Sequence, residues 1–546
     1  MDRRAFLLSS AGILSAAALS LIPGSDPKGK AGIPFSGSIV GPSYGLGHRL
    51  LRGEFPKPGQ ERKTTVAIVG GGISGLSAGW KLNKAGFQDF EILDLEPEVG
   101  GVSLSGANSI SPYPWGAHYV PLPTVESRAV RELFEEIGVI EGRTGAGQPV
   151  YKEKYLCFSP QERLYIHGKW QEGLLPALGA TRRDLDQFQK FKELILKYRS
   201  RRGKDGKKAF AIPMEFSSRD AEFLALDRIS MRAFLIQQGI DSIPLHWYVN
   251  YACRDDYGSH YDAVSAWAGL HYFCSRDGGG DSEESTVLTW PEGNGWIVKQ
   301  LEAKVKAKVK RNSLVYRLTD TGKEVLVDVY SPKENISTRI RAKQVICSCP
   351  RIFARYMIEG NRPSDPPYVK EFHYSPWMVA NLSLSAFPET KSGMDLAWDN
   401  VIYDSPSLGY VVATHQSLAT RMKKTVLTYY HAMVWGLPVQ ERTRLLQTSW
   451  AEWADFILRD LSKPHPEIRE LITHLDIFRW GHAMVQPRVG FIWGEARKQA
   501  AQPRGNIYFA HSDLSGFSIF EEAQYRGVLA AERILAKQGF SFSSSL

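Results

Sequence analysis

Three glycines in one short turn are the first residues of this chain whose spacing suggests a chemical role. Residues 70–75 read Gly-Gly-Gly-Ile-Ser-Gly, so Gly70, Gly72 and Gly75 have the spacing G-x-G-x-x-G. The first glycine permits a tight turn, the second lets a pyrophosphate approach backbone N–H groups, and the third lets a helix pack closely on a strand. The helix that begins near Ser74 would direct its positive end toward the phosphates. The turn, with Ser74, therefore predicts a dinucleotide-binding site.

An acidic residue follows the turn at the distance that ribose recognition requires. Asp94 ends an apolar run about 20 residues after the glycines, where a carboxylate can accept hydrogen bonds from ribose hydroxyls. Glu96 is the nearest alternative, and a carboxylate at the end of a strand can also be merely solvated. Asp94 is the predicted ribose ligand.

The residues around the turn predict the elements that position it. Residues 66–69 form a short apolar, β-branched run, the pattern of a strand buried on both faces. Helical spacing of apolar residues continues to Gly86, and residues 90–95 form a second apolar run. A lone G-x-G-x-x-G is a weak motif, but here strand, turn, helix, strand and acid follow in the order of a Rossmann-type unit.

The composition is that of a large globular protein. The chain has 546 residues, 43% of them hydrophobic and 23% charged, with a net charge of +9. This length allows two or more domains. The basic run at residues 197–208 lacks interleaved aromatic residues, so we expect a solvated loop and no nucleic-acid partner. The five cysteines have no metal-ligand spacing, so no metal site is predicted.

The N-terminus predicts export. Arg3 and Arg4 precede a mildly apolar, Ala- and Ser-rich segment that ends at Pro23, which resembles a twin-arginine signal. An uncleaved membrane anchor is the alternative, but the segment barely reaches the ~20 residues of a membrane span. We therefore expect a periplasmic protein that the twin-arginine export machinery transports in folded form.

Further segments extend the pattern beyond the first unit. They are Gly100-Gly101, soon after Asp94; residues 312–318, a strand with Val315 placed to cover an adenine; residues 344–350, an apolar strand that ends in proline; residues 509–513, a strand that leads to Asp513 and then to a helix; residues 115–119 (Trp-Gly-Ala-His-Tyr); and residues 291–296 (Pro-Glu-Gly-Asn-Gly-Trp).

Together these segments resemble the FAD-dependent amine oxidase superfamily, which includes monoamine and polyamine oxidases, phytoene desaturases and protoporphyrinogen oxidase. The resemblance implies an α/β fold, with a discontinuous Rossmann-like FAD-binding domain and an α+β substrate-binding domain. The expected divisions are a signal peptide (1–25), a linker or arm (26–60), the FAD-binding domain (61–125, 282–351 and 465–539) and the substrate-binding domain (126–280 and 352–463). Within the arm, the more apolar residues 35–41 are suited to lie along the protein body.

The resemblance also implies roles for single residues. Asp513 would contact the ribityl–phosphate region of FAD, and Gly100 and Gly101 would add a second phosphate contact. Backbone N–H groups near Ser518 and Ile519, at a helix start, would face the negative charge of reduced flavin. The expected substrate-facing residues are Trp480, His482, His118, Trp115 and Asn294. Each of the aromatic residues could instead serve only in packing. We expect His118 and His482 to titrate near neutral pH, so that one of them could accept the substrate ammonium proton or merely hydrogen-bond it.

The chain also departs from the family. Val102 and Ser103 follow the paired glycines where the family often has arginine, and residues 375–387 contain no counterpart of the lysine near flavin N5. Ile519 takes the place of a tyrosine of the aromatic cage. The covalent-flavin cysteine motif is absent, which favours non-covalent FAD.

The function expected from these observations is oxidation of a C–H bond, most simply of an amine, by hydride transfer to flavin N5. No second nucleotide motif is visible, so the electron acceptor would be oxygen, a quinone or a periplasmic carrier. One alternative is a desaturase or isomerase of an isoprenoid, which would need a long apolar tunnel and no anionic pocket. Another is a flavin-binding assembly protein without turnover.

Overall fold

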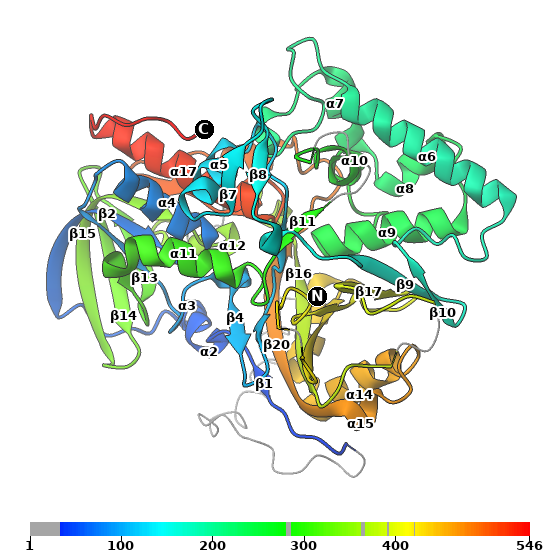
Figure 1. The fold of residues 1–546 in the computed structure, drawn as a ribbon. Helices are drawn as coiled ribbons and strands as arrows, with labels where there is room; N and C mark the ends of the chain where they lie inside the picture. The colour runs from blue at the N-terminus through cyan, green and yellow to red at the C-terminus, as the bar shows by residue number, and fades with distance from the viewer. Residues whose placement is uncertain (1–32, 280–285, 362–365, 390–392, 420) are drawn as a thin grey trace, which may run out of the picture.

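The computed structural model describes residues 33–279, 286–361, 366–389, 393–419 and 421–546 (Figure 1). The predicted signal peptide lies outside these residues. Two large sheets, one of seven strands and one of eight, lie side by side, and a group of helices sits above the eight-stranded sheet (Figure 1). Within the described ranges, no helix is long and apolar enough to cross a membrane.

The glycine turn belongs to a seven-stranded sheet with the order β12-β3-β2-β15-β14-β13, in which β21 also pairs with β15. Its strands are β2 (Gln60–Val69), β3 (Phe90–Leu93), β12 (Val309–Lys310), β13 (Leu314–Asp320), β14 (Val325–Ser331), β15 (Ile336–Cys347) and β21 (Ile507–Phe509). β3, β2, β15 and β21 are parallel, so their carboxyl ends meet at one edge of the sheet. Gly70, Asp94, Ser348 and His511 follow these strand ends, at the edge where open α/β sheets bind ligands.

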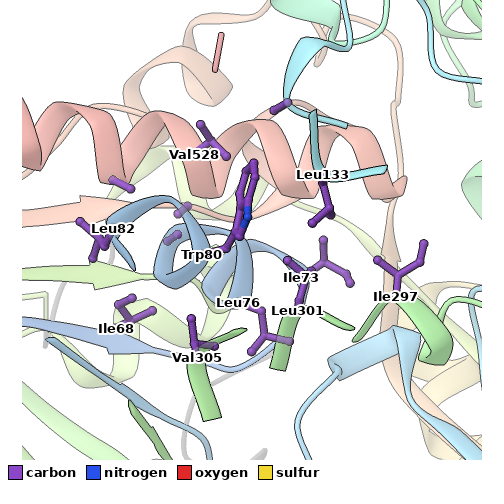
Figure 2. Packing of buried hydrophobic residues seen from close by; sticks show 14 of the residues in the cluster. Ile68, Ile73, Leu76, Trp80, Leu82, Leu133, Ile297, Leu301, Val305 and Val528 are labelled. Atoms are coloured by element: carbon purple, nitrogen blue, oxygen red, sulfur yellow. The ribbon is translucent and has the colours of Figure 1, made fainter. Parts of the chain in front are cut away.

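Helices cover this sheet and hold the turn in place (Figure 2). They include α4 (Ile73–Lys84), α5 (Arg128–Glu136), α11 (Gly295–Val305) and α17 (Phe520–Lys537). Trp80 of α4 is 2% exposed and packs in one apolar cluster with Leu301 of α11 and Val528 of α17. α17 lies close to α4 because Gly527 has no side chain: a Cβ there would come within 2.1 Å of the Ser74 carbonyl oxygen.

The second sheet has eight strands in the order β1-β20-β16-β19-β18-β17-β9-β10. The strands are β1 (Ile39–Val40), β9 (Glu162–Ile166), β10 (Lys169–Glu172), β16 (Tyr374–Leu384), β17 (Asp399–Ile402), β18 (Gly409–Val412), β19 (Thr425–Ala432) and β20 (Ile472–Val485). Every residue of β16 is buried, because both faces of the sheet are covered. Met378 packs on the face that carries α14 (Trp450–Leu461), whereas Trp377 and Val379 belong to the cluster that contains Trp115.

The helical group packs between this second face and α17. Its helices are α6 (Arg182–Ser200), α7 (Ala221–Ala225), α8 (Met231–Gln237), α9 (Ile243–Tyr257) and α10 (Ala266–Cys274). Trp267 is fully buried at its centre and stacks on His271 and Phe517. The group therefore contacts the loop that leads into α17.

Shorter elements connect these units. They are α2 (Tyr44–Gly47), α3 (Arg49–Arg52), β4 (Ser105–Ala107), β5 (Pro112–Pro114), β6 (Tyr119–Pro121), β7 (Ile140–Arg143), β8 (Pro149–Tyr151), β11 (Val287–Thr289), α12 (Arg351–Met357), α13 (Pro438–Gln447), α15 (Ile468–Leu471) and α16 (Glu495–Ala500).

The arm that precedes the first sheet is packed along the protein body. β1 pairs in parallel with β20, and the Ser38 backbone N–H donates to Asp476, 3.0 Å away. Ser43 is bound to Glu96, and Phe55 stacks on Tyr316 of β13 with ring centroids 4.2 Å apart. Residues 33–60 therefore join the two sheets, where the composition alone suggests a linker or arm.

One domain boundary lies later in the chain than the sequence analysis placed it. Residues 472–485 were expected in the FAD-binding domain but form β20, which pairs with β16 and β1 of the larger sheet. The strand mixes buried and half-buried residues, a pattern that either sheet could accept. Its pairing with β16 decides which sheet it joins. The chain returns to the seven-stranded sheet only after β20, at β21.

Candidate functional site

The glycine turn has the geometry that a pyrophosphate needs. Gly70 has a φ of +103°, and a Cβ on Gly75 would lie 1.9 Å from the Gly70 carbonyl oxygen, so both positions require glycine. A Cβ on Gly72, by contrast, would meet no described heavy atom within 4 Å. Open space thus lies beside the N-terminus of α4, where backbone N–H groups and the helix dipole favour a diphosphate.

The second glycine pair lies against this turn. The Gly100 backbone N–H donates to the Gly71 carbonyl oxygen, 2.9 Å away, and a Cβ on Gly101 would be 3.5 Å from the Gly72 Cα. Gly100 and Gly101 have φ values of +137° and +56°. The structure therefore brings together two glycine segments that the sequence separates.

The two carboxylates considered for ribose binding have different surroundings. Asp94 accepts hydrogen bonds from the backbone N–H groups of Gly71 at 2.5 Å and Glu96 at 2.8 Å, and burial raises its pKa. The Glu96 side chain instead accepts from the Ser43 backbone and hydroxyl, both at 2.8 Å. Glu96 thus anchors the arm, and Asp94 remains at the turn.

Two further predicted cofactor residues, Ser74 of α4 and Val315 of β13, are both buried. Ser74 is 3% exposed, and its carbonyl faces Gly527 at the α4–α17 contact. Val315 of β13 is also 3% exposed and packs in the apolar cluster that contains Leu93.

The two carboxylate oxygens of Asp513 have different surroundings. The residue is fully buried, and its Oδ2 accepts from the Arg351 backbone N–H at 2.8 Å and the Tyr374 hydroxyl at 2.5 Å. Its Oδ1 has no hydrogen-bond partner among the described residues, although His511 Nδ1 lies 3.2 Å away. Burial acts to raise the pKa of Asp513, but His511, Tyr374 and the Arg351 N–H together bring it below its ordinary value. Oδ1 of this ionised carboxylate has lone pairs beyond its contact with His511, so it can also accept a hydrogen bond from a hydroxyl such as those of a ribityl chain.

The start of α17 carries a buried acid, Glu521, which no sequence motif indicates. Ile519 is the N-cap of this helix, and the Ser518 hydroxyl oxygen accepts from the Val485 backbone N–H at 3.0 Å. Glu521, in the first turn, is 2% exposed, and its Oε2 has no hydrogen-bond partner in the described part of the chain. Burial raises the pKa of Glu521 to about 7, against the opposing effect of Arg276.

The segment of residues 115–119 is fixed between both sheets. Trp480 of β20 donates its indole N–H to the Trp115 carbonyl oxygen at 2.6 Å. The Asn294 side chain donates to the Tyr119 carbonyl oxygen at 3.1 Å, and its own buried Oδ1 lacks a partner among the described residues. Four of the five predicted substrate-facing residues, Trp115, His118, Asn294 and Trp480, therefore belong to one neighbourhood.

Beside this segment lies a cavity of about 160 Å³. His118 and Tyr119 form part of its wall, together with further aromatic rings, acidic residues, the arginines Arg199 and Arg276, and several apolar or small residues. Its further lining includes Glu162, Tyr251, Asp255, Tyr272, Arg276, Trp398, Asp399 and Tyr430. Of the predicted substrate-facing residues, His118 is the one that lines this cavity.

Three carboxylates share the cavity and repel one another. Burial, and then the charge of Asp256, raise the pKa of Asp255 to about 7. Burial, followed by the charges of Asp255 and Glu162, raises the pKa of Asp399 well above its ordinary value. The pKa of Glu162 is also raised by burial. Such mutual repulsion is relieved when a cation enters.

The charge of the neighbouring acid, Asp256, is balanced by an arginine. It forms an ion pair with Arg276, whose guanidinium also lies over the Tyr272 ring at 4.3 Å. Asp255, one residue earlier on α9, has no ion pair within the described ranges. Both acids lie on a buried helix, which the aromatic-rich sequence around them could have indicated. No sequence signal marks Asp399 or Glu162, because each lies on a short strand.

The histidines differ from expectation. Burial lowers the pKa of His118 to about 4 and that of His482 to about 3, so neither titrates near neutral pH. His482 projects toward Phe353 and Tyr374, with ring centroids 5.1 and 6.2 Å away, and not into the cavity. Near the predicted flavin site, burial instead raises the pKa of the acids Asp255 and Glu521 to about 7.

Comparison with known proteins supports the same fold. The family model of the NAD(P)-binding Rossmann-like domain matches residues 68–137. A search of curated proteins finds no match.

Solved structures cover nearly the whole chain. Putrescine oxidase with bound putrescine has a TM-score of 0.61 and 15% identity, covering 87% of this chain and 100% of its own. Cyclohexylamine oxidase from Brevibacterium oxydans has a TM-score of 0.61 and 15% identity, covering 88% and 100%. A fatty acid isomerase from P. acnes that produces CLA has a TM-score of 0.60 and 17% identity, covering 87% and 98%. These similarities confirm the predicted fold class, a Rossmann-like domain combined with an α+β domain.

Proposed function

We propose that this protein is an FAD-dependent oxidoreductase that oxidises a C–H bond of an amine. The observation that carries the proposal is the wall of the cavity, where Asp255, Asp399 and Glu162 face a space of about 160 Å³. Carboxylates this close favour a cationic guest, because the guest offsets their repulsion. Aromatic rings in the same wall, including Tyr251 and Tyr430, add cation–π attraction.

The residues around the glycine turn fit FAD as the cofactor. The open space at Gly72 and the start of α4 would hold the pyrophosphate, and Asp94 would hold the ribose. Oδ1 of Asp513 would accept a hydrogen bond from the ribityl chain. When bound there, FAD would supply the hydride acceptor, flavin N5. Non-covalent attachment is part of the proposal, because the sequence lacks the covalent-flavin cysteine motif.

Asp255 is suited to handle the substrate proton. An amine loses hydride readily only when its nitrogen is neutral, so the ammonium proton must first leave. Ionised Asp255 would pair with the ammonium group, and its pKa of about 7 lets it also accept that proton near neutral pH. The neutral His118 would border the same space without carrying charge.

The alternatives are less consistent with this cavity. An acyl or isoprenoid chain, as the similarity to a fatty acid isomerase would suggest, would do nothing to offset the repulsion among the three acidic residues of this wall. A flavin-binding assembly protein would not need an anionic cavity beside the predicted flavin segment.

Anaerobic mixing with substrate tests the proposal. FAD-loaded protein should lose its yellow flavin absorbance with a di- or polyamine, but not with a carotenoid, a fatty acid or an N-acetylated amine of the same length. Bleaching by an apolar substrate alone would favour the desaturase or isomerase. Absence of bleaching with every candidate, from protein that retains FAD, would favour the assembly protein.

We further propose export to the periplasm by the twin-arginine route, with oxygen, a quinone or a periplasmic carrier as electron acceptor. Arg3 and Arg4 ahead of the weakly apolar segment support this. Arg3→Lys combined with Arg4→Lys should leave the precursor in the cytoplasm. Delivery of that double variant to the periplasm would contradict the proposal.

A further inference from the structure

Two thiols lie in contact at the edge of the predicted cofactor site. Cys347 ends β15 and Cys349 follows two residues later, with their Sγ atoms 3.3 Å apart. Cys347 is buried, whereas Cys349 is partly exposed. The hydrogen bond between the thiols lowers the pKa of Cys347, and the nearby Arg351 guanidinium adds to this effect. The same bond holds the pKa of Cys349 above its ordinary value.

The residue between these cysteines holds the glycine turn. The Ser348 Oγ lies 2.8 Å from both the Val69 and the Gly70 carbonyl oxygens, and the Ser348 N–H donates to Val69 at 2.9 Å. A Cβ on Gly75 would also come within 2.7 Å of this Oγ. The position of Ser348 and the shape of the turn are therefore linked.

The same segment also reaches the Asp513 loop. The Cys347 carbonyl oxygen accepts from the Ala510 N–H at 3.0 Å, and the Arg351 N–H donates to Asp513 at 2.8 Å. A change in backbone conformation between Cys347 and Arg351 would thus affect both halves of the predicted FAD site.

The other three cysteines are isolated from one another. The Cys157 and Cys274 thiols each approach a backbone carbonyl oxygen at 3.7 Å, and Cys253 is 1% exposed. Burial raises the pKa of all three thiols. In the described ranges, Cys347 and Cys349 are the one pair of thiols in contact, so these cysteines provide internal controls.

We propose that Cys347 and Cys349 form a reversible disulfide whose formation loosens the FAD-binding turn. The sulfurs need to approach by only about 1.2 Å to reach bonding distance. Because the ring would contain a single intervening residue, closure must rotate the Ser348 peptide groups and disturb their contacts with Gly70. The predicted effect on FAD binding rests on the proposed function, in which Gly70 and its neighbours bind FAD. Formation of the disulfide does not depend on that function.

The oxidant would be a disulfide of low molecular weight or of an exchange protein, R–S–S–R. The accessible Cys349 sulfur attacks one sulfur of R–S–S–R and releases RS⁻, while its proton passes along the hydrogen bond to the Cys347 thiolate. Cys347 then attacks the Cys349 sulfur and displaces the second RS⁻. In total the protein loses two S–H hydrogens and gains one S–S bond, and R–S–S–R takes up both electrons and protons to become two RSH molecules.

The test uses the full-length, FAD-loaded protein in buffers with different ratios of reduced to oxidised glutathione. After acid quenching and denaturation, free thiols are alkylated and counted by mass spectrometry. Oxidised protein should carry two fewer alkyl groups, and the peptide that contains both cysteines should be the unalkylated one. FAD released through a filter membrane should rise several-fold across the same transition and fall again on reduction.

Two variants control the measurement. Cys349→Ser should abolish both the thiol loss and the redox dependence of FAD release, whereas Cys274→Ser should change neither. Full alkylation of Cys347 and Cys349 under all oxidising conditions would overturn the disulfide. A disulfide that forms without changing FAD release would overturn the link to the turn. If the chain retains no FAD at all, the proposed function fails, and the thiol count still decides the disulfide.

Discussion

The imidazole ring of His118 stacks on the phenol ring of Tyr430, with centroids 4.6 Å apart and planes inclined by 28°. The Tyr430 hydroxyl also donates to the Gly116 carbonyl oxygen at 2.9 Å. A strand of the larger sheet thus fixes the segment that is expected to pass the flavin. Tyr430→Phe keeps the ring but removes the hydroxyl, so stopped-flow flavin reduction should slow about tenfold, equal to 1.4 kcal/mol, with FAD content unchanged.

Tyr429→Phe is the matched control for that variant. Its hydroxyl is equally buried but donates to Asp460 on the other face of β19, at 2.9 Å. This change should lower the melting temperature without slowing flavin reduction. Equal slowing by both variants would show that Tyr430 acts only through general stability.

Gly72→Val should abolish FAD retention while leaving the fold intact. A Cβ at this position meets no described atom, and the φ of −72° suits any residue, so the side chain would occupy only the pyrophosphate space. Gly59→Val is the control, since a Cβ there also meets no described atom and lies outside the turn. Circular dichroism and the flavin released by acid measure both effects; FAD bound normally by Gly72→Val would contradict the assignment of the site.

Asp255→Asn should weaken binding of a quaternary ammonium ion, a cation whose own charge does not titrate. Because the pKa of Asp255 is raised to about 7, wild-type affinity should increase as the pH rises through 7, and the variant should bind at least tenfold more weakly at pH 8 and lose the part of this increase that is centred on pH 7. Perturbation of the flavin spectrum reports the binding. An unchanged increase in affinity through pH 7 in the variant would show that another group titrates there.

The Asp255→Asn variant, although it should bind the cation more weakly, should be more stable than the wild type at high pH. A raised carboxyl pKa means that ionisation costs more in the folded protein than in the unfolded chain. Stability from this group is therefore present below the unfolded pKa of about 4 and lost as the pH rises through about 7. Asp255→Asn should melt a few degrees higher than wild type at pH 8 and equally at pH 4, whereas Asp256→Asn should melt lower because it breaks the Arg276 ion pair.

His482→Ala should leave the pH profile of flavin reduction unchanged between pH 5 and 9. Burial already holds the pKa of His482 at about 3, so no ionisation in this range is removed. Loss of the contacts with Phe353 and Tyr374 should instead raise the rate of FAD release several-fold, because Tyr374 supports Asp513. A shift of the kinetic pKa in this variant would restore His482 as a proton acceptor.

Glu521→Gln should remove an ionisation near pH 7 from the flavin reduction potential. The pKa of Glu521 is raised to about 7, and its side chain lies in the first turn of the helix expected to face reduced flavin. Above pH 7 the wild-type carboxylate should disfavour the added negative charge, so the variant should have the higher potential there and an equal one at pH 5. Redox-dye titration at both pH values measures this; identical potentials throughout would place Glu521 away from the flavin.

The first βαβ unit was predictable because its information is local. The strand, the glycine turn, α4 and Asp94 lie within one short stretch, and the steric needs at Gly70 and Gly75 follow from the backbone alone. The final strand and α17 were predictable for the same reason, since a buried apolar run and a long helical pattern do not depend on distant partners.

The substrate cavity could not be predicted in this way. Asp255, Asp399 and Glu162 come from α9, β17 and β9, and only the parallel pairing of β17 with β9 and the packing of the helical group bring them together. The pKa values follow the same logic: a sequence shows His118 and His482 as ordinary imidazoles, but burial keeps both neutral. The local chemistry of the dinucleotide turn is thus determined by sequence neighbours, whereas the charge of the cavity was decided by tertiary structure, because desolvation and repulsion depend on which distant side chains share a small space.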